Sequence, residues 1–298
     1  MEEDNLHLNN GDAVLESLGL EPQMKKNVGA FDILCVGFNI SNSWVGLAAT
    51  MVVGMEQGGS VTVLYGMIVT LVALGCSACT MAELASVYPT AGGPYHWTSI
   101  LGPRRGRYVL SYACAAFNIF GWLSICSSVT IQPGQFIEAM RISYNPELEP
   151  DAWQFFLFYQ ATNLLIVLYN IFAQRRTSWI HDVGFAFSLT SFMVIFVTCL
   201  SRTPSYRTSK FVWTNFVNNS GWSSDAVVFL TGMANPNFIF AGIDGAVHLA
   251  EEVTDAAKTV PRALFSTIGI GFVTAFVFAI AMLYSTVDFE TVIEDATG

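Results

Sequence analysis

The sequence predicts an all-α integral membrane protein. Of its 298 residues, 53% are hydrophobic and only 12% are charged, whereas an ordinary soluble domain carries about 25% charged residues. From Phe31 onward, the apolar residues come in blocks close to the ~20 residues that a helix needs to cross the hydrocarbon core of a bilayer. The scarcity of charge and the length of the blocks together indicate a chain that crosses the membrane repeatedly.

The apolar blocks predict seven spans within a transmembrane domain at about 31–285. A polar tail over residues 1–30 precedes this domain, and a short acidic tail over 286–298 follows it. The predicted spans are about 31–55, 61–84, 107–138, 153–173, 180–201, 225–250 and 264–285.

The basic residues predict that the N-terminus is cytoplasmic, because cytoplasmic loops carry an excess of Lys and Arg. In this orientation nine basic residues face the cytoplasm and four face the outside. Asn218 lies in an N-x-S triplet on the outer side and is a predicted glycosylation acceptor. The expected location is the plasma membrane, with the vacuolar or another membrane as the alternative. The inner basic residues are Lys25, Lys26, Arg104, Arg105, Arg107, Arg175, Arg176, Lys258 and Arg262, and the outer ones are Arg141, Arg202, Arg207 and Lys210.

Composition and spacing argue against several other classes of protein. The net charge of −10 leaves no basic stripe for a nucleic acid. The six cysteines lie within apolar runs, and the pair Cys76 and Cys79 is interpreted as helix packing rather than as half of a zinc site. We find no nucleophile and base at suitable spacing. The sequence therefore predicts neither an enzyme nor a bound cofactor or metal.

Three spans contain polar or helix-breaking residues, and two of them, the first and the sixth, are predicted to be broken at membrane depth. In the first, Asn39, Ser41, Asn42 and Ser43 follow one another closely, and such side chains compete with the helix for backbone hydrogen bonds. In the third, the helix breakers Pro133 and Gly134 interrupt the apolar run.

The sixth span contains Asn235-Pro236 and then Asp244 between Gly242 and Gly245. One interpretation of the first and sixth spans is ordinary polar packing between helices. The other is a pair of discontinuous helices whose free backbone groups hold a ligand. An odd number of spans in each unit would make a second unit that begins at span six enter the membrane in the opposite direction. This inverted repeat favours the second interpretation.

Two stretches resemble a known family of transporters. Glu83-Leu-Ala-Ser-Val-Tyr-Pro-Thr-Ala-Gly-Gly-Pro-Tyr-His-Trp97 is similar to the E-x-A-x-x-Y-P-x-A-G-G-x-Y-x-W signature of the amino acid–polyamine–organocation (APC) transporters. Gly242-Ile-Asp-Gly-Ala-Val-His-Leu-Ala-Glu-Glu252, continuing to Val260-Pro261-Arg262, is similar to the fungal branch of choline, γ-aminobutyrate (GABA) and amino-acid permeases.

The resemblance covers residues 20 to 285. It implies a LeuT-like 5+5 inverted-repeat transporter fold that works by alternating access. The first five-helix repeat would occupy about 31–201, and the second would begin at about 225–285. Relatives with this fold have further helices, so the resemblance implies a fold truncated after about seven transmembrane helices.

The two breaks supply the predicted substrate-binding residues. At the first break, the positive end of a half-helix would face an anionic group of the substrate. Trp44 departs from the small residues that are usual there, and it would either crowd an α-carboxylate or offer a cation–π face to an ammonium. The predicted substrate-binding residues are Asn39, Ser41, Asn42, Ser43, Trp44, Phe238, Phe240, Ala241, Gly242 and Asp244.

Asp244 is the most informative single residue, because an unpaired carboxylate at membrane depth costs ~2.5–3.5 kcal/mol. It either caps a half-helix beginning at Gly245 or handles a cation or proton. His248 is either a satisfied inward-facing histidine or a proton relay. Glu83 and Glu251, at predicted inner helix ends, form a cytoplasmic gate or are solvated charges worth ~0–1 kcal/mol per ion pair. The predicted gate and coupling residues are Glu83, Asp244, His248 and Glu251.

These observations predict a secondary active transporter, or permease, of a small amine-bearing solute such as an amino acid, GABA, choline or a polyamine. Its expected partners are this solute, the lipid bilayer and coupled protons, but not nucleic acid. The alternative is a truncated, non-transporting membrane protein that associates with or regulates a full-length permease.

Overall fold

A computed structural model of the chain describes residues 28–145, 151–174 and 179–286. Within these ranges the regular elements are all helices, with two isolated β-bridges, Val28 with Val253 and Gln57 with Asn218. The predicted tails, up to residue 27 and from residue 287, lie outside the described residues, as do Arg175 and Arg176. The prediction of an all-helical chain is confirmed for the described part.

Within the described part of the chain, six helical segments are long and apolar enough to cross a membrane. Five of the predicted spans coincide with continuous helices, and the first coincides with two consecutive helices, α2 and α3. Such lengths support a multi-pass integral membrane protein. The segments are α2–α3 (Ala30–Ser41 and Ser43–Glu56), α4 (Gly59–Val87), α6 (Arg107–Tyr144), α7 (Ala152–Phe172), α8 (Ile180–Arg202) and α13 (Ala256–Ser285).

The predicted sixth span, 225–250, is a broken segment, as expected, and it is not among the continuous helices long enough to cross a membrane. This stretch forms three short helices, α10 (Asp225–Gly232), α11 (Ala234–Phe238) and α12 (Gly245–His248), joined by turns. Pro236 removes a backbone donor, and Gly242 has a positive φ of 76° that ends any helical path.

Pro133 and Gly134, which interrupt the apolar run of the third span, do not break its helix, because α6 continues through Pro133. Membrane helices tolerate proline where neighbouring groups compensate. Gly134 instead permits close packing, since a Cβ atom there would lie 3.2 Å from the ring of Phe155 on α7.

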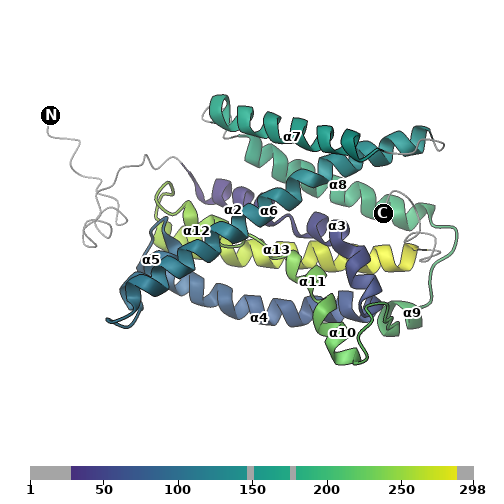
Figure 1. Cartoon of the computed structure of the whole chain (residues 1–298), viewed down its shortest axis with the longest axis horizontal. Coiled ribbons are helices and arrows are strands. Elements are labelled where there is room, and N and C mark those ends of the chain that lie inside the picture. Colours follow the sequence, from purple (N-terminus) through teal and green to yellow (C-terminus); the bar gives the residue numbers. More distant parts are fainter. Residues whose placement is uncertain (1–27, 146–150, 175–178, 287–298) are drawn as a thin grey trace.

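The described helices form one central group around α13, and α6 and α7 form a helical hairpin outside this group (Figure 1). α13 packs against α2, α3, α4 and α8, and α6 packs mainly against α7 and the short helix α5 (Gly93–Leu101). Another short helix, α9 (Ser209–Thr214), contacts α4 and α13. The main core contains fully buried Phe38, Leu47, Leu64 and Met67.

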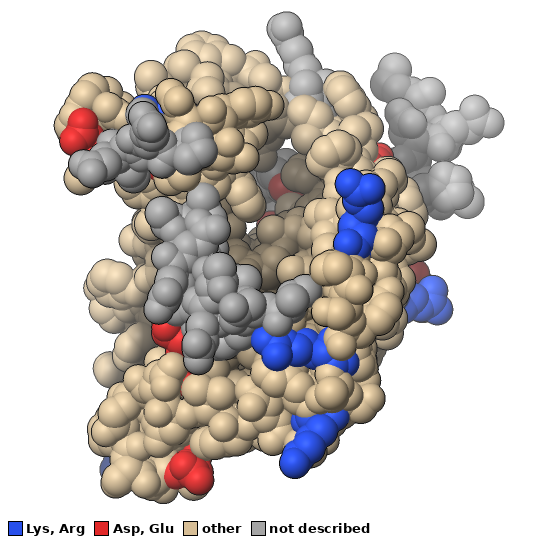
Figure 2. All heavy atoms as spheres, turned by 90° about the vertical axis from the view of Figure 1, so that its right-hand side faces the viewer, with Lys and Arg blue, Asp and Glu red and all other residues tan. Residues whose placement is uncertain are grey.

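The outer helices present apolar surface. In the most apolar 18-residue window of α6 and in that of α7, no residue is buried inside the described structure. Such surfaces suit lipid, in which apolar side chains need no protein cover. Figure 2 looks instead onto the end of the molecule where α9 and α10 lie, and charged side chains stand there among the uncharged ones.

Candidate functional site

The first break is a single residue, Asn42, between α2 and α3. Its backbone is left-handed, with φ 30° and ψ 58°, a conformation that asparagine tolerates better than most residues. Its Oδ1 accepts a hydrogen bond from the Ser188 hydroxyl of α8 at 2.9 Å. The neighbouring Ser43 hydroxyl donates to the carbonyl oxygen of Ile239 at 2.6 Å. The predicted interruption is confirmed, and it directly contacts the segment that follows α11.

The second break extends from the end of α11 to α12. Gly242 is closely packed there, because a Cβ atom on it would lie 2.7 Å from Cγ2 of Ile40 and 3.3 Å from the ring of Trp122. Ile40 belongs to the last turn of α2, just before the first break. The predicted interruption near 241–245 is confirmed, and the two breaks face each other as expected.

Asp244, in the second break, is held by three nitrogen atoms. Its Oδ2 accepts hydrogen bonds from Nδ2 of Asn118 at 2.8 Å and from Nε1 of Trp122 at 3.1 Å, both on α6. Nε2 of His248 lies 3.3 Å from the same oxygen. The carboxylate makes no capping bond to the backbone of α12, so the interpretation of Asp244 as a side-chain cap is wrong. Charge-assisted bonds to α6 offset the cost of this carboxylate instead.

His248 connects the second break to the loop after α4. Its Nδ1 lies 2.8 Å from the carbonyl oxygen of Ala91. In return, the backbone N–H of Ala91 donates to Oε1 of Glu251 at 2.9 Å. The two stretches that carry the family resemblance, far apart in sequence, are therefore hydrogen-bonded to each other.

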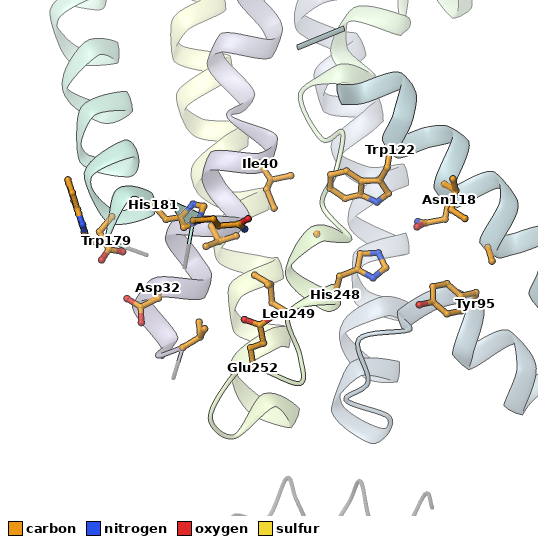
Figure 3. A pocket seen from close by; sticks show the side chains of 17 residues that line it. Asp32, Ile40, Tyr95, Asn118, Trp122, Trp179, His181, His248, Leu249 and Glu252 are labelled. Carbon is orange, nitrogen blue, oxygen red and sulfur yellow. The ribbon is translucent and has the colours of Figure 1, made fainter. Parts of the chain in front are cut away.

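A cavity of about 1170 Å³ adjoins this cluster. Figure 3 shows Asn118, Trp122, His248 and Tyr95 on one side of it and Trp179, His181 and Asp32 on the other. The described lining includes three carboxylates, those of Asp32, Asp182 and Glu252, and no lysine or arginine. Its aromatic members are Tyr95, Trp122 and Trp179. Acidic and aromatic side chains together favour a cationic ligand.

Most predicted residues of the first break have protein partners. Nδ2 of Asn39 donates to the carbonyl oxygen of His181 at 2.6 Å, and the Ser41 hydroxyl donates to that of Gly37 at 3.2 Å. Trp44 is 6% exposed, and its Nε1 donates to the Ser188 hydroxyl at 3.0 Å. None of Asn39, Ser41 and Trp44 is among the residues that line the cavity, and their substrate-binding role stays a prediction.

The predicted aromatic residues of the sixth span lie away from the cavity lining. Phe240 is 3% exposed and belongs to the main core. Phe238 is half-buried and lies against α3, where a Cβ atom on Gly46 would be 3.2 Å from its ring. Ala241 is half-buried beside Gly242. Their binding role also stays a prediction.

The predicted gate residues are only partly brought together. Glu83 is exposed near the end of α4 and, among the described residues, forms no ion pair. Asp255 and Lys258 form an exposed ion pair with each other at 3.1 Å. Asn218 is exposed, and its Nδ2 donates to the carbonyl oxygen of Trp222 at 2.8 Å. The gate and the glycosylation of Asn218 stay predictions.

Asn118 and Trp122 are the site residues that sequence reasoning missed. They stand four residues apart, so they lie on the same face of α6. Asn118 is the one asparagine in the apolar run at 107–138, and a hydrogen-bonding pair on one face of a span was the available signal.

The comparisons with known proteins agree with this arrangement of motifs. The model of the amino acid permease family matches residues 29–297. The choline transporter of Saccharomyces cerevisiae is 32% identical over 279 residues, which is 93% of this chain and 49% of that protein. A putative amino acid/polyamine transporter of Macrophomina phaseolina is 30% identical over 261 residues, 88% of this chain and 57% of that protein.

An amino-acid permease of Arabidopsis thaliana is 26% identical over 298 residues, covering 98% of this chain and 58% of the plant protein. No solved structure matches the chain. The chain spans about half the length of the curated relatives it matches. The family match extends over nearly the whole chain, and the chain therefore belongs to the amino acid permease family, whose members are transporters rather than enzymes.

Proposed function

We propose that the protein is a secondary active transporter of a small amine-bearing solute, such as an amino acid, GABA, choline or a polyamine. The observation that carries the proposal is the carboxylate of Asp244. It lies at the second helix break, which faces the first break and stands beside a cavity. Ionisable groups within membrane segments are costly and mark the pathways of substrates or ions.

The chemistry of the cavity supports an ammonium group as the feature recognised. Carboxylates attract it, and the faces of Trp122, Trp179 and Tyr95 offer cation–π contacts. The names of two relatives, a choline transporter and an amino acid/polyamine transporter, refer to solutes that share a positively charged nitrogen. At the second break, Ala241, Gly242 and Asp244 would contact the ammonium group of the substrate.

The residues of the first break have a different proposed role. Asn42 and Ser43 hold α2 and α3 against α8 and the second break, and the same holds for Trp44 through Ser188. We propose that these residues keep the half-helices in position during alternating access.

For the overall architecture we propose a LeuT-like 5+5 inverted repeat. α2–α3 would begin the first repeat, and α10–α12 would begin the second, each as a broken helix. With a cytoplasmic N-terminus in the plasma membrane, the cavity lies toward the cytoplasm, because Val28, Gln174 and Glu252 in its lining belong to predicted inner segments. This orientation corresponds to an inward-facing state.

Uptake into proteoliposomes tests the proposal. The purified chain is assayed with radiolabelled choline, GABA, putrescine and a mixture of amino acids, with Asp244→Asn as the variant. Hydrogen bonds to charged groups contribute ~1.5–3 kcal/mol, so we expect uptake to fall about tenfold or more.

Asp255→Asn is the matched control. It removes a carboxylate from an exposed ion pair at the start of α13, and asparagine accepts its left-handed backbone. Uptake by this variant should equal that of the wild type. Normal uptake by a folded Asp244→Asn variant would refute the assignment of this residue. Absence of uptake by folded wild-type protein, together with its co-purification with a full-length permease, would favour the regulatory alternative.

A further inference from the structure

The neighbours of His248 fix the number of protons that it carries. Its Nδ1 lies 2.8 Å from the carbonyl oxygen of Ala91, and its Nε2 lies 3.3 Å from Oδ2 of Asp244. A carbonyl oxygen only accepts, so Nδ1 must carry a hydrogen. A neutral imidazole has one N–H, and its Nε2 would then turn a lone pair toward the carboxylate. A favourable Nε2–Oδ2 contact therefore requires one further proton between these two atoms.

The other partners of Asp244 favour the imidazole as the place of this proton. The indole N–H of Trp122 can only donate, and it donates to the same Oδ2 that the Asn118 amide contacts. An oxygen surrounded by three donors is best described as part of a charged carboxylate. His248 is then an imidazolium that donates on both sides.

This proton is within reach of the cavity. His248 lines the cavity, and its side chain is 26% exposed. The imidazole also joins two elements that are remote in sequence, because Ala91 belongs to the loop at 88–92 between α4 and α5. The imidazole of His248 is therefore both the group that gains or loses the proton and the link between two parts of the fold.

We propose that the Asp244–His248 pair is a single-proton latch that fastens the second break to the loop at 88–92. The latch deepens the proposed function, on which it rests, as a control of the same site. When the pair loses its proton, the proton passes from Nε2 to water or buffer in the cavity, and a neutral imidazole remains. If Nδ1–H stays on Ala91, the lone pair of Nε2 repels Oδ2. If the ring turns to donate to Asp244, it releases Ala91.

Other titratable groups face this region from several elements. Within the described residues, the hydrogen-bond partners of the imidazole are Asp244 and Ala91, so the latch responds directly to Asp244, while the other groups act through space. Those groups are Asp32 on α2, Tyr95 on α5, His181 and Asp182 on α8, and Glu251 and Glu252 after α12.

Nitrogen-15 NMR of histidine-labelled chain in nanodiscs tests the latch without requiring transport. The sequence has four histidines, and the His248 signals are those that vanish in His248→Asn. Asparagine places its amide nitrogen near the position of Nδ1, so this variant keeps a donor for Ala91 while removing the titrating group. His96→Asn, on α5, is the control that should leave the His248 signals in place.

The expected result is one step in which Nε2 of His248 loses its proton while Nδ1 keeps its own or exchanges between tautomers. This step should shift to lower pH in Asp244→Asn, because the charged partner is lost. A neutral His248 already present under the most acidic conditions at which the chain folds would overturn the latch. So would a step that Asp244→Asn leaves unchanged.

Transport supplies the second measurement. The pH profile of uptake should contain a step that disappears in His248→Asn and persists in His96→Asn. An identical profile in wild type and a folded His248→Asn variant would overturn the control of transport by the latch. If the wild type shows no uptake, the proposed function fails, while the NMR titration still decides whether the single-proton site exists.

Discussion

The two helix breaks of this chain differ in the charge and exposure of their polar groups. At the first break neutral side chains bond to protein: Asn42 and Trp44 to Ser188, and Ser43 to the carbonyl oxygen of Ile239. At the second, Asp244 and His248 also have protein partners, but they are ionisable and remain partly exposed beside a cavity.

This difference separates two uses of irregular backbone in a membrane. A break that carries only neutral polar side chains bonded to protein provides shape but no charge to attract a solute. A break that carries ionisable groups next to a cavity retains the means to bind a cation or proton. We therefore regard the first break as the positioning element and the second as the binding element.

The largest effect on stability is expected at Asn42. Asn42→Ala would place an alanine in the left-handed region, at a cost of ~1–2 kcal/mol, and would remove the bond to Ser188, worth ~0.5–1.5 kcal/mol. We expect a loss of about 2–3 kcal/mol in the free energy of unfolding, measured by denaturation in mixed micelles. Asn42→Gly keeps the backbone conformation and should lose only the bond. Equal losses in both variants would show that the left-handed backbone is not a feature of the folded protein.

Gly242 should give the next largest effect. Gly242→Ala puts a Cβ atom at a φ of 76° and 2.7 Å from Ile40, and we expect a loss of about 1–2 kcal/mol from the backbone conformation alone. Gly269→Ala on α13 is the control, since a Cβ atom there meets nothing within 4 Å. It should be neutral or slightly stabilising because alanine favours helix. Equal melting temperatures of the two variants would contradict the close contact between Gly242 and Ile40 at the two breaks.

A smaller effect is expected at Trp122. Trp122→Phe keeps an aromatic ring in the cavity lining but removes the N–H that donates to Asp244. The other two nitrogens remain, so uptake should fall only about fivefold, the equivalent of ~1 kcal/mol. Trp153→Phe removes a similar indole bond, to Asp151 at the exposed start of α7, and should not affect uptake. Equal uptake by the two variants would show that the N–H donated by Trp122 on α6 does not contribute to transport.

The long helices could be predicted from the sequence because their cause is local. Spans predicted at 61–84, 153–173 and 180–201 match α4, α7 and α8 to within a few residues. Crossing hydrocarbon demands both length and a fully bonded backbone, and composition reveals both requirements. Proline alone was a poor guide, since Pro133 lies within a continuous helix while Pro236 lies in a broken segment.

The candidate site could be predicted only in part. Asp244 stood out as an ionisable residue in an apolar run, but its partners did not. Asn118 and Trp122 reach it across more than a hundred residues of sequence, and their approach depends on how α6 is rotated. The surroundings of Trp44 could not be predicted for the same reason, because its ring packs against Phe192 and Phe278 from two other helices.

Ligand binding to two variants tests the division of roles most directly. Equilibrium binding of the best-transported labelled amine is measured on purified wild type, Asp244→Asn and Asn42→Gly, each first shown to be folded. The account predicts that Asp244→Asn weakens binding about tenfold or more, while Asn42→Gly changes it by less than about threefold, because Asn42 bonds to Ser188 rather than to the ligand. Strong binding by Asp244→Asn together with lost binding by Asn42→Gly would contradict the account and place the ligand at the first break.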